Sequence, residues 1–394
     1  MTQKNLKIIF ISSYIPRECG IATYTNNVIG AIKAADPSVQ ASVVAMNDAE
    51  YNYPKEVISS INQEKDQDYI KAADVINKSD CEVVSVQHEF GIYGGFNGRK
   101  LLLLLKNIKK PIVITLHTVP VNLDKPVRIR SKKHASRIKL FEKMFSYVDG
   151  IAVMTETAKS YLESNVKSAK NKIAVIPHGA PILTSNKIKE FSAEKKSLGI
   201  DAGDIVISTF GLITPKKGIE YMISSMPKIV ASNPEKRIKY FVLGKAHPKK
   251  PDHYLINLKK LAVKLKMEDN VIFDSRYLDY VEIYRYLVNS SIYITPYYSK
   301  EQASSGTLSY AIACGKCIVT TPYVFAQDAV GDHQVGELVK FRDSGSIVSV
   351  MNKLIQNPSL IAKYEKNSKE FGQTLEWPKI GQKFINLFTK NIRG

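Results

Sequence analysis

Short apolar runs alternate with amphipathic stretches along most of the chain. In the first half, six runs are almost continuously apolar, at residues 8–11, 41–45, 83–86, 112–116, 150–154 and 173–176. Continuous apolar runs are typical of strands buried on both faces of a parallel sheet. Between two of them, apolar residues recur at helical spacing and predict a helix with a core-facing side: Ile138, Phe141, Phe145 and Val148.

The alternation breaks at Pro177-His178-Gly179 and resumes after a polar, lysine-rich stretch over 183–198, which we expect to connect two domains. Further apolar runs follow at 205–210, 240–243, 271–273, 292–295 and 317–320. The pattern predicts an α/β protein with two Rossmann-like, doubly wound domains, over 1–182 and 190–372, followed by a last helix. Ligands in such sheets bind at the carboxyl ends of the strands, so we expect the site where these ends face each other across a cleft.

The composition narrows the class of protein. The chain has 394 residues, of which 44% are hydrophobic and 24% charged, unlike a disordered or fibrous protein. The longest apolar run, Leu101–Leu105, is far shorter than the ~18 residues of a membrane span. The run at 8–11 is too short for a signal-peptide core, so we expect a cytoplasmic protein. Cys314 and Cys317 form a C-x-x-C pattern without a second pair, which favours buried side chains at a helix–strand turn over a zinc site.

The net charge is +19, which suits nucleic acid, an anionic membrane surface or anionic small ligands. Part of the excess gathers between Lys125 and Lys143, where eight basic residues accompany one glutamate. No zinc-finger spacing, RNP motif or basic zipper accompanies it, so we expect no nucleic-acid partner. A solvated helix face is the favoured interpretation, because the apolar stripe suits the core and the basic face has no Trp or Phe to insert. Peripheral association with an anionic membrane, at its inner face, is the alternative.

In the first half, the unusual local sequences follow predicted strands. Cys19-Gly20-Ile21-Ala22-Thr23 opens a helix whose N-terminal N–H groups can face an anion, with an ordinary glycine turn as the alternative. Gln87-His88-Glu89, followed by Tyr93 and three glycines, suits a loop that hydrogen-bonds a polyhydroxylated ligand. His117 ends a buried strand and would contact a sugar hydroxyl or act in catalysis; a satisfied structural histidine is the alternative.

Two sequences in the second half suit phosphate. Gly211 follows a strand, and Lys216-Lys217-Gly218 stands at a helix start, so that N–H groups and an ammonium can converge on one anion. Residues 301–308 place small side chains at another helix N-terminus. Two such anion corners in one domain suggest a diphosphate, as in a nucleotide-sugar. Neither the G-x-G-x-x-G nor the P-loop order is present.

Taken together, these motifs resemble the GT-B glycosyltransferases of family GT4 over nearly the whole chain. Gly211 to Gly218 resembles the family's G-R-L-x-x-x-K-G element, and residues 309–319 with Thr321-Pro322 resemble its E-A-M-A-x-G-x-P-V segment. The motifs C-G-I-A-T and Q-H-E-x-G-I, with Ala246-His247-Pro248 and residues 274–278, resemble a subgroup. Trp377 and the last helix, over 377–394, resemble the GT-B tail, which crosses back to the first domain.

The resemblance implies the function and the site. It implies retaining transfer of a hexose, with mannose or glucose as first guesses, from a nucleotide-sugar to a carbohydrate or lipid-linked acceptor, with no cofactor and no obligatory metal. The implied catalytic residues are His117, Lys217 and Glu301. The implied donor-binding residues are Gly20, Gly211, Lys217, Arg276, Gln302, Ser305, Gly306, Thr307 and Leu308. The implied acceptor-binding residues are Gln87, His88, Glu89 and Tyr93.

The chain departs from the family pattern at the donor site. Leu212 stands where the family has an arginine, and Arg276 is a candidate source of the missing guanidinium. With the register anchored on Ala313-Cys314-Gly315, the family's two glutamates fall at Gln302 and Tyr310. These departures leave two rival functions open: a phosphorylase that handles sugar 1-phosphate, and a non-catalytic carbohydrate-binding protein.

Overall fold

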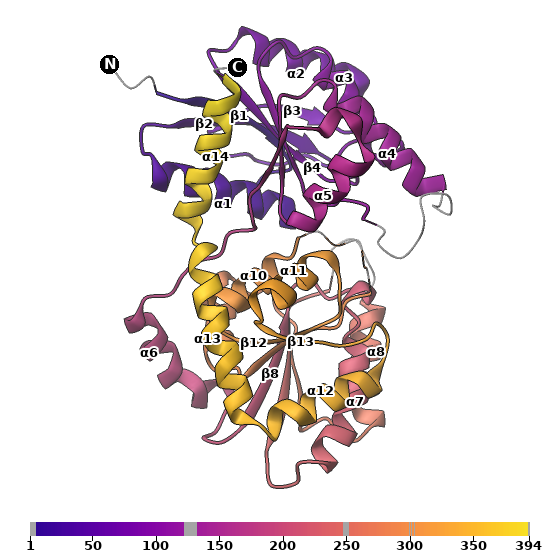
Figure 1. The fold of residues 1–394 in the computed structure, drawn as a ribbon, viewed down its shortest axis with the longest axis vertical. Helices are drawn as coiled ribbons and strands as arrows, with labels where there is room; N and C mark the ends of the chain where they lie inside the picture. Colours follow the sequence, from indigo (N-terminus) through magenta and orange to yellow (C-terminus); the bar gives the residue numbers. More distant parts are fainter. Residues whose placement is uncertain are drawn as a thin grey trace. The chain divides into compact units, whose positions relative to one another are not determined.

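The computed structural model describes residues 5–121, 132–246, 252–298, 300, 302 and 304–392. The chain divides into two compact units by its internal contacts. The first unit comprises Met1–Gly179, Glu301–Ser304 and Trp377–Gly394, and the second comprises Ala180–Lys300 and Ser305–Glu376. Each unit is built around its own parallel sheet with helices on the faces (Figure 1).

The sheet of the first unit has the strand order β3-β2-β1-β4-β5-β6-β7 within the described residues, and all neighbouring strands are parallel. The order reverses between β1 and β4, which is where a doubly wound sheet binds its ligands. The strands are β1 (Lys7–Ser12), β2 (Gln40–Asn47), β3 (Val57–Asn62), β4 (Val83–His88), β5 (Ile112–Leu116), β6 (Gly150–Val153) and β7 (Ile173–Val175).

Helices cover both faces of this sheet. They are α1 (Gly20–Ala35), α2 (Asp66–Lys78), α3 (Leu101–Leu105), α4 (Lys132–Phe145), α5 (Glu156–Asn165) and α14 (Trp377–Ile392), with short 3-10 turns η1 (Phe96–Gly98) and η3 (Lys167–Ala169). The predicted helix stripe is present, although α4 ends at Phe145 and the buried Val148 lies beyond it.

The C-terminal helix α14 packs against α1 near the start of the chain. The contact is close because both helices present small groups: a Cβ on Gly381 would lie 2.2 Å from the carbonyl oxygen of Ala31. Phe384 and Phe388 of α14 are fully buried in the core of the first unit. The last helix of the chain therefore completes a core that the first residues begin.

The sheet of the second unit has the order β10-β9-β8-β11-β12-β13 in the described chain, again entirely parallel. Its order reverses between β8 and β11. The strands are β8 (Ile205–Phe210), β9 (Ile238–Leu243), β10 (Val271–Asp274), β11 (Ile292–Thr295), β12 (Cys317–Thr320) and β13 (Gly336–Leu338). The helices are α6 (Ser185–Ala193), α7 (Ile219–Ala231), α8 (His253–Lys264), α9 (Tyr280–Val288), α10 (Gly306–Ala313), α11 (Val324–His333), α12 (Ser344–Ile355) and α13 (Pro358–Thr374), with 3-10 turns η4 (Glu194–Leu198) and η5 (Pro215–Lys217).

The prediction of two parallel, doubly wound α/β domains is confirmed, since every strand expected from a continuous apolar run is present. The stretch over 183–198, expected as a connection, forms α6 and η4 of the second unit. Two strands were not predicted, β3 and β13. Both lie at an edge of their sheet, where one side of the strand is exposed and its sequence is not continuously apolar.

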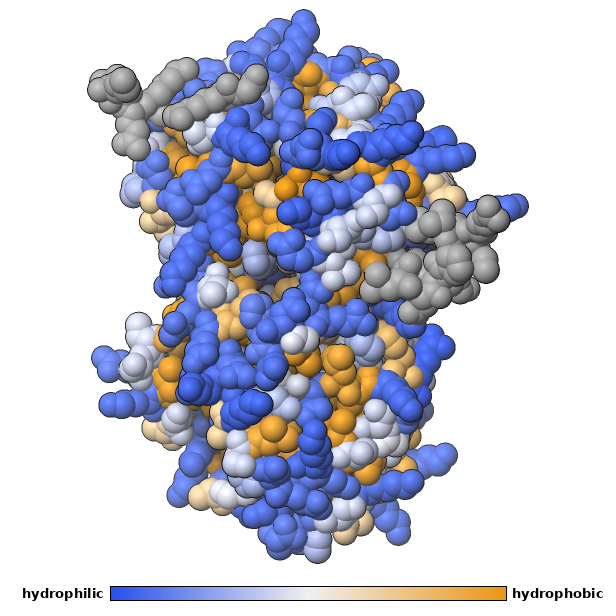
Figure 2. Space-filling model, viewed as in Figure 1, coloured by the Kyte–Doolittle hydropathy of each residue, from blue (hydrophilic) through white to orange (hydrophobic). Residues whose placement is uncertain are grey.

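Because the apolar strands are buried, the surface is mainly hydrophilic. On the face shown in Figure 2, hydrophilic side chains cover most of the molecule, and apolar side chains appear in small separate patches. No helix in the described part of the chain is long and apolar enough to cross a bilayer. Cys314 and Cys317 are free thiols at the end of α10 and the start of β12, and burial raises the pKa of both.

Candidate active site

In the second unit, the segment after β8 makes a sharp turn that only glycines allow. Gly211 has a φ of +122° and Gly218 a φ of +63°, values that residues with a side chain rarely adopt. A Cβ on Gly218 would lie 2.0 Å from the carbonyl oxygen of Pro296, which follows β11. The turn therefore lies directly against the end of the neighbouring strand, at the point where the strand order reverses.

Lys217 is held at this turn by a tyrosine that the sequence analysis did not single out. Its Nζ donates a hydrogen bond to Tyr297 Oη at 2.5 Å and lies 4.2 Å from the centre of the same ring. Tyr297 Oη lies 2.9 Å from Thr307 Oγ1, which in turn lies 3.2 Å from Ser305 Oγ. Lys217 and the start of α10 therefore belong to one hydrogen-bonded cluster.

Gly211 closes this cluster from the side of β8. A Cβ at Gly211 would lie 3.3 Å from Thr307 Cγ2 and 3.5 Å from Lys217 Nζ. Within the residues that the structure describes, the partner recorded for the Lys217 ammonium is a phenol, and no ion pair with a carboxylate is formed. A single positive charge that is held in place without a counter-ion suits an anionic ligand.

The N-terminus of α10 adds amide groups to the same corner. Ser305 is the N-cap, and its Oγ accepts the N–H of Leu308 at 3.3 Å. The N–H groups of Gly306 and Thr307 come before the first intrahelical donor and point out of the helix end. Leu308 is fully buried and its N–H is already used, so it anchors the helix rather than offering a donor.

Arg276 lies at the end of β10, two strands away from β8 in the sheet order. Its guanidinium bonds Asp274 at 2.7 Å and Glu282 at 3.1 Å, and the side chain is two-thirds exposed. The hydrogen bonds from Arg276 hold the pKa of the Asp274 carboxyl below its usual range. In the described chain, no contact of Arg276 with Lys217 or Thr307 is recorded, so its charge is engaged on its own strand end.

In the first unit, the ends of β4 and β5 bring Gln87 and His117 together. His117 Nε2 lies 3.0 Å from Gln87 Oε1, and both side chains are buried. Burial, with the nearby His178, lowers the pKa of His117 to about 3. The imidazole is therefore neutral near pH 7 and can act through hydrogen bonds rather than through charge.

His117 belongs to an aromatic cluster collected from distant parts of the sequence. The ring of Tyr24 on α1 lies 4.6 Å from the ring of His117 and 5.0 Å from that of His178. Trp377, at the start of α14, packs on both Tyr24 and His178. Burial lowers the pKa of His178 to about 4. The cluster is uncharged at neutral pH, and Tyr24 and Trp377 are members that strand-end motifs alone did not indicate.

The residues expected to bind the acceptor fall on two sides of β4. Gln87 faces His117, and Glu89 Oε2 accepts a hydrogen bond from Thr118 Oγ1 at 2.5 Å. His88 points the other way and is fully buried against Phe90, Tyr93 and Phe141. Alternate strand residues point to opposite faces, so the motif Q-H-E divides between the strand-end site and the core.

Tyr93 supports the same strand end from within the core. Its side chain is buried, and its hydroxyl donates to the carbonyl oxygen of Gln87 at 2.9 Å. The structure therefore places Tyr93 behind Gln87 and the polar strand end.

Gln302 and Ser304, which precede α10, group with the first unit. Ser304 Oγ donates to the carbonyl oxygen of His117 at 3.1 Å, and Gln302 Nε2 donates to the carbonyl oxygen of Ser304 at 3.0 Å. Glu301, expected to be catalytic, lies outside the described residues, as do His247 and Pro248 of the subgroup motif.

Gly20 is the first residue of α1 and is exposed. A Cβ there would meet no atom within 4 Å, so neither packing nor backbone strain in this structure requires glycine. Cys19, the N-cap residue, makes no side-chain cap bond to the first N–H groups of α1. In the described part of the chain, no group of three or more His, Cys, Asp or Glu side chains is arranged to hold a metal ion.

The family that matches this chain covers part of the second unit. Residues 190–371 match the family model described as Glycosyl transferases group 1. An uncharacterized glycosyltransferase of Methanocaldococcus jannaschii is 27% identical over 250 residues, which are 63% of this chain and 60% of that protein. D-inositol 3-phosphate glycosyltransferase 2 of Catenulispora acidiphila is 25% identical over 206 residues, 51% of this chain and 46% of that protein. The chain thus spans about half to three-fifths of the length of these curated relatives.

Solved structures match nearly the whole chain in fold. Sucrose-phosphate synthase of Thermosynechococcus elongatus superposes with a TM-score of 0.76 at 16% identity, covering 98% of this chain and 99% of that one. HepE of Anabaena, solved in complex with UDP, gives a TM-score of 0.72 at 15% identity, covering 98% and 100%. Residues 190–371 are therefore similar to the glycosyl transferases group 1, and the chain as a whole shares its fold with sucrose-phosphate synthase and HepE.

Proposed function

We propose that the protein is a retaining glycosyltransferase that moves a hexose from a nucleotide-sugar to a hydroxyl of a carbohydrate or glycolipid acceptor. The observation that carries the proposal is the cluster of Lys217, Tyr297 and Thr307 at the N-terminus of α10. One ammonium and two free amide groups meet there, beside a glycine that leaves space. Such a corner suits the diphosphate of a nucleotide-sugar.

The chemistry of the proposed reaction explains why this corner would matter for rate. The bond between the sugar and the diphosphate breaks while positive charge develops on the sugar ring. Negative charge builds up at the same time on the departing phosphate, and donors fixed in place lower that barrier. Lys217 and the amides of Gly306 and Thr307 would supply those donors. The departing phosphate would then take the proton of the attacking hydroxyl, on the same face of the sugar.

The uncharged strand end of the first unit suits the sugar and the acceptor. A neutral His117, held by Gln87, can exchange hydrogen bonds with hydroxyl groups without attracting a second anion. Glu89 and Thr118 extend this polar edge. We assign contact with the transferred sugar to His117, and the acceptor side to Gln87 and Glu89. His88 and Tyr93 would act from behind them, because both are buried.

The nucleotide part of the proposal is supported by solved relatives of the fold. HepE of Anabaena was solved with UDP, with UDP and glucose, and with UDP-glucose. We therefore propose UDP-glucose as the first donor to test, with GDP-mannose as the second. Neither donor is implied by a side chain of this protein, since Tyr310 stands at a family glutamate position and packs against Phe210 and Tyr284.

The decisive experiment is a screen of nucleotide-sugars for turnover, combined with calorimetric titration of UDP, GDP and hexose 1-phosphates. A glycosyltransferase binds a nucleoside diphosphate and releases it on adding an acceptor sugar or glycolipid. Binding of hexose 1-phosphate with no binding of either nucleotide would instead indicate a phosphorylase. Activity that persists after treatment with EDTA is expected, because we propose no obligatory metal.

We also propose that α4 lies against an anionic membrane while the enzyme meets a lipid-linked acceptor. Four lysines lie along the described helix, Lys132, Lys133, Lys139 and Lys143, and all four are exposed. The residues at 125–131 that add to this charge lie outside the described chain. Sedimentation with liposomes that contain anionic lipid should recover the protein, and neutral liposomes should not. If the protein sediments with neither kind of liposome, the membrane is removed from the proposal.

A further inference from the structure

The edge of the first unit's sheet at β7 presents unpaired backbone groups. The N–H of Ile151 donates to the carbonyl oxygen of Lys172 at 2.9 Å, and the N–H of Ile176 donates to the carbonyl oxygen of Val153 at 2.8 Å. In a parallel ladder, alternate residues of a strand bond to the same neighbour. Residues 172, 174 and 176 thus face β6, and the N–H and C=O groups of Ile173 and Val175 point outward. Within the described residues, no hydrogen bond is recorded for these outward groups.

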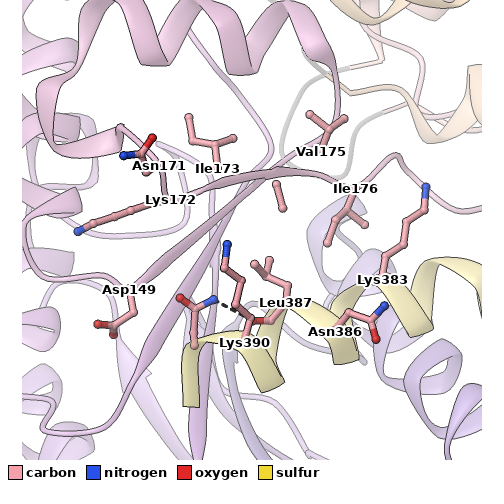
Figure 3. Close-up of a pocket in the computed structure, with 12 residues that line it drawn as sticks. Asp149, Asn171, Lys172, Ile173, Val175, Ile176, Lys383, Asn386, Leu387 and Lys390 are labelled. Atoms are coloured by element: carbon pink, nitrogen blue, oxygen red, sulfur yellow. Dashed lines mark hydrogen bonds between the residues drawn. The ribbon is translucent and has the colours of Figure 1, made fainter. Parts of the chain in front are cut away.

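A trough runs beside this open edge, between β7 and α14 (Figure 3). Its volume is about 430 Å³. Ala174 of β7 and Ile176 just after it pack on the core that α14 completes, and together with Leu387 they form the apolar wall of the trough. Ile173 and Val175 also line the trough, and its other lining residues are polar or charged: Asp149, Asn171, Lys172, Lys383, Asn386, Lys390 and Asn391.

The charges that face the trough are mainly positive. Lys383 and Lys390 lie two turns apart on α14, are exposed, and extend from the helix toward β7 in Figure 3. Lys172 already donates to the carbonyl oxygens of Phe145 and Val148. Asp149 is the carboxylate of the lining, and its Oδ2 accepts the N–H of Ile112. Two ammonium groups therefore remain to receive negative charge from a ligand beside the edge.

We propose that this edge binds an extended, acidic segment of a partner protein as an added strand. Main-chain groups of that segment would pair with Ile173 and Val175, and its alternate side chains would hang over α14. Carboxylates at those alternate positions would meet Lys383 and Lys390, while small apolar side chains between them would face outward. A second copy of this chain is a poorer fit, because its own edge carries the same lysines and the protein has a net charge of +19.

The site is separate from the proposed active site. The trough lies along β7 and α14, whereas His117 and Gln87 lie at the carboxyl ends of β5 and β4. Variants in the trough are therefore expected to keep any transferase activity. If the protein proves not to transfer a glycosyl group, the proposed strand binding still stands. If it does not bind the strand, the proposed glycosyl transfer still stands.

The test uses a fluorescein-labelled peptide of seven residues in which glutamate alternates with valine, titrated with the full-length protein by fluorescence anisotropy. Binding is expected, and the double variant K383E/K390E should weaken it about tenfold or more. A matched double variant with the same change in net charge, K228E/K236E on the second unit, should not weaken it; both control lysines are exposed.

Two further measurements separate strand pairing from attraction of charge. Val175→Pro removes an outward N–H and should weaken binding by about fivefold, while Val175→Ala, which also loses the valine side chain but keeps the N–H, should not. Circular dichroism checks that both variants keep the fold. The same peptide methylated on every backbone nitrogen has the same charge but has no N–H group left to donate to the edge, and it should bind at least tenfold more weakly. Equal binding of the methylated peptide, unchanged binding to Val175→Pro, or no binding of the acidic peptide would each overturn the proposal.

Discussion

The carboxyl ends of the two sheets present opposite chemistry on similar scaffolds. In the first unit, the strand end collects buried neutral groups, with His117 against Tyr24 and Gln87. In the second unit, it presents the ammonium of Lys217 and the open amides of α10. Gln87 lies on β4 and Lys217 follows β8, and each of these strands is one of the two between which its sheet reverses the strand order. The difference shows that one architecture can serve two tasks, hydrogen bonding to uncharged hydroxyls in one unit and binding of an anion in the other.

The largest expected difference between the two units is in how far acid lowers their stability. Burial lowers the pKa of His88 and His117 to about 3 and that of His178 to about 4. Unfolded histidine has a pKa of about 6.5, so above that pH all three are neutral in both states and cost nothing. As the pH falls toward 4, only the unfolded chain takes up protons, and each histidine removes at most about 1.4 kcal/mol per pH unit from the free energy of unfolding.

The measurement uses the single tryptophan, Trp377, whose fluorescence reports the first unit. Its denaturant midpoint should fall markedly between pH 7 and pH 5. The second unit should respond less, because only one of its described histidines, His333, has a pKa that burial lowers, against three in the first unit. The variant His88→Phe should lower the pH dependence of the fluorescence midpoint, whatever its effect on stability at pH 7. A tryptophan transition that is the same at both pH values would show that these histidines are not buried as described.

Lys217→Ala should have the largest effect on activity. Removal of one fixed donor to a developing negative charge costs on the order of 3 kcal/mol, which is about a hundredfold in kcat. The matched control is Lys216→Ala, which removes an exposed ammonium one residue earlier in the same turn. We expect at least a tenfold loss of kcat for the first variant and nearly full activity for the second, in steady-state assays with the donor found by screening. Near-normal turnover of Lys217→Ala would refute its role.

Tyr297→Phe should have a smaller effect. The ring stays beneath the ammonium, but the hydroxyl that joins Lys217 to Thr307 is lost. We expect kcat to fall about five- to tenfold, because a hydrogen bond to a charged group is worth about 1.5 kcal/mol or more. Tyr298→Phe is the control, since the neighbouring ring packs instead on Tyr221. If both variants behave alike, Tyr297 does not position Lys217.

Gly20→Ala should have the smallest effect, a change in the KM for the donor alone. The added methyl group meets no protein atom within 4 Å, and alanine favours a helix over glycine by up to about 1 kcal/mol. Stability should therefore be unchanged or raised. A several-fold rise in the KM for the donor is expected if a ligand approaches this backbone closely. Gly30→Ala, equally open in the middle of the same helix, should leave KM unchanged.

Local pattern was sufficient to predict most of the fold. Continuous apolar runs correspond to the central strands, because a strand buried on both faces has no position that tolerates a polar side chain. The edge strands β3 and β13 escaped prediction, since exposure on one side permits polar residues. The two phosphate-type turns were also predictable, because glycine at positive φ and small residues at a helix start have local signatures.

What the sequence alone determined was therefore the sheet class, the order of elements and the segments that carry the site. Only the tertiary structure decided which side chains meet. Tyr297 joins Lys217 to Thr307, and Trp377 reaches Tyr24 from the far end of the chain. The tertiary structure also decided that His88 lies in the core while Gln87 faces His117. Contacts between residues far apart in sequence depend on strand order and side-chain direction, and no local pattern of residues encodes either.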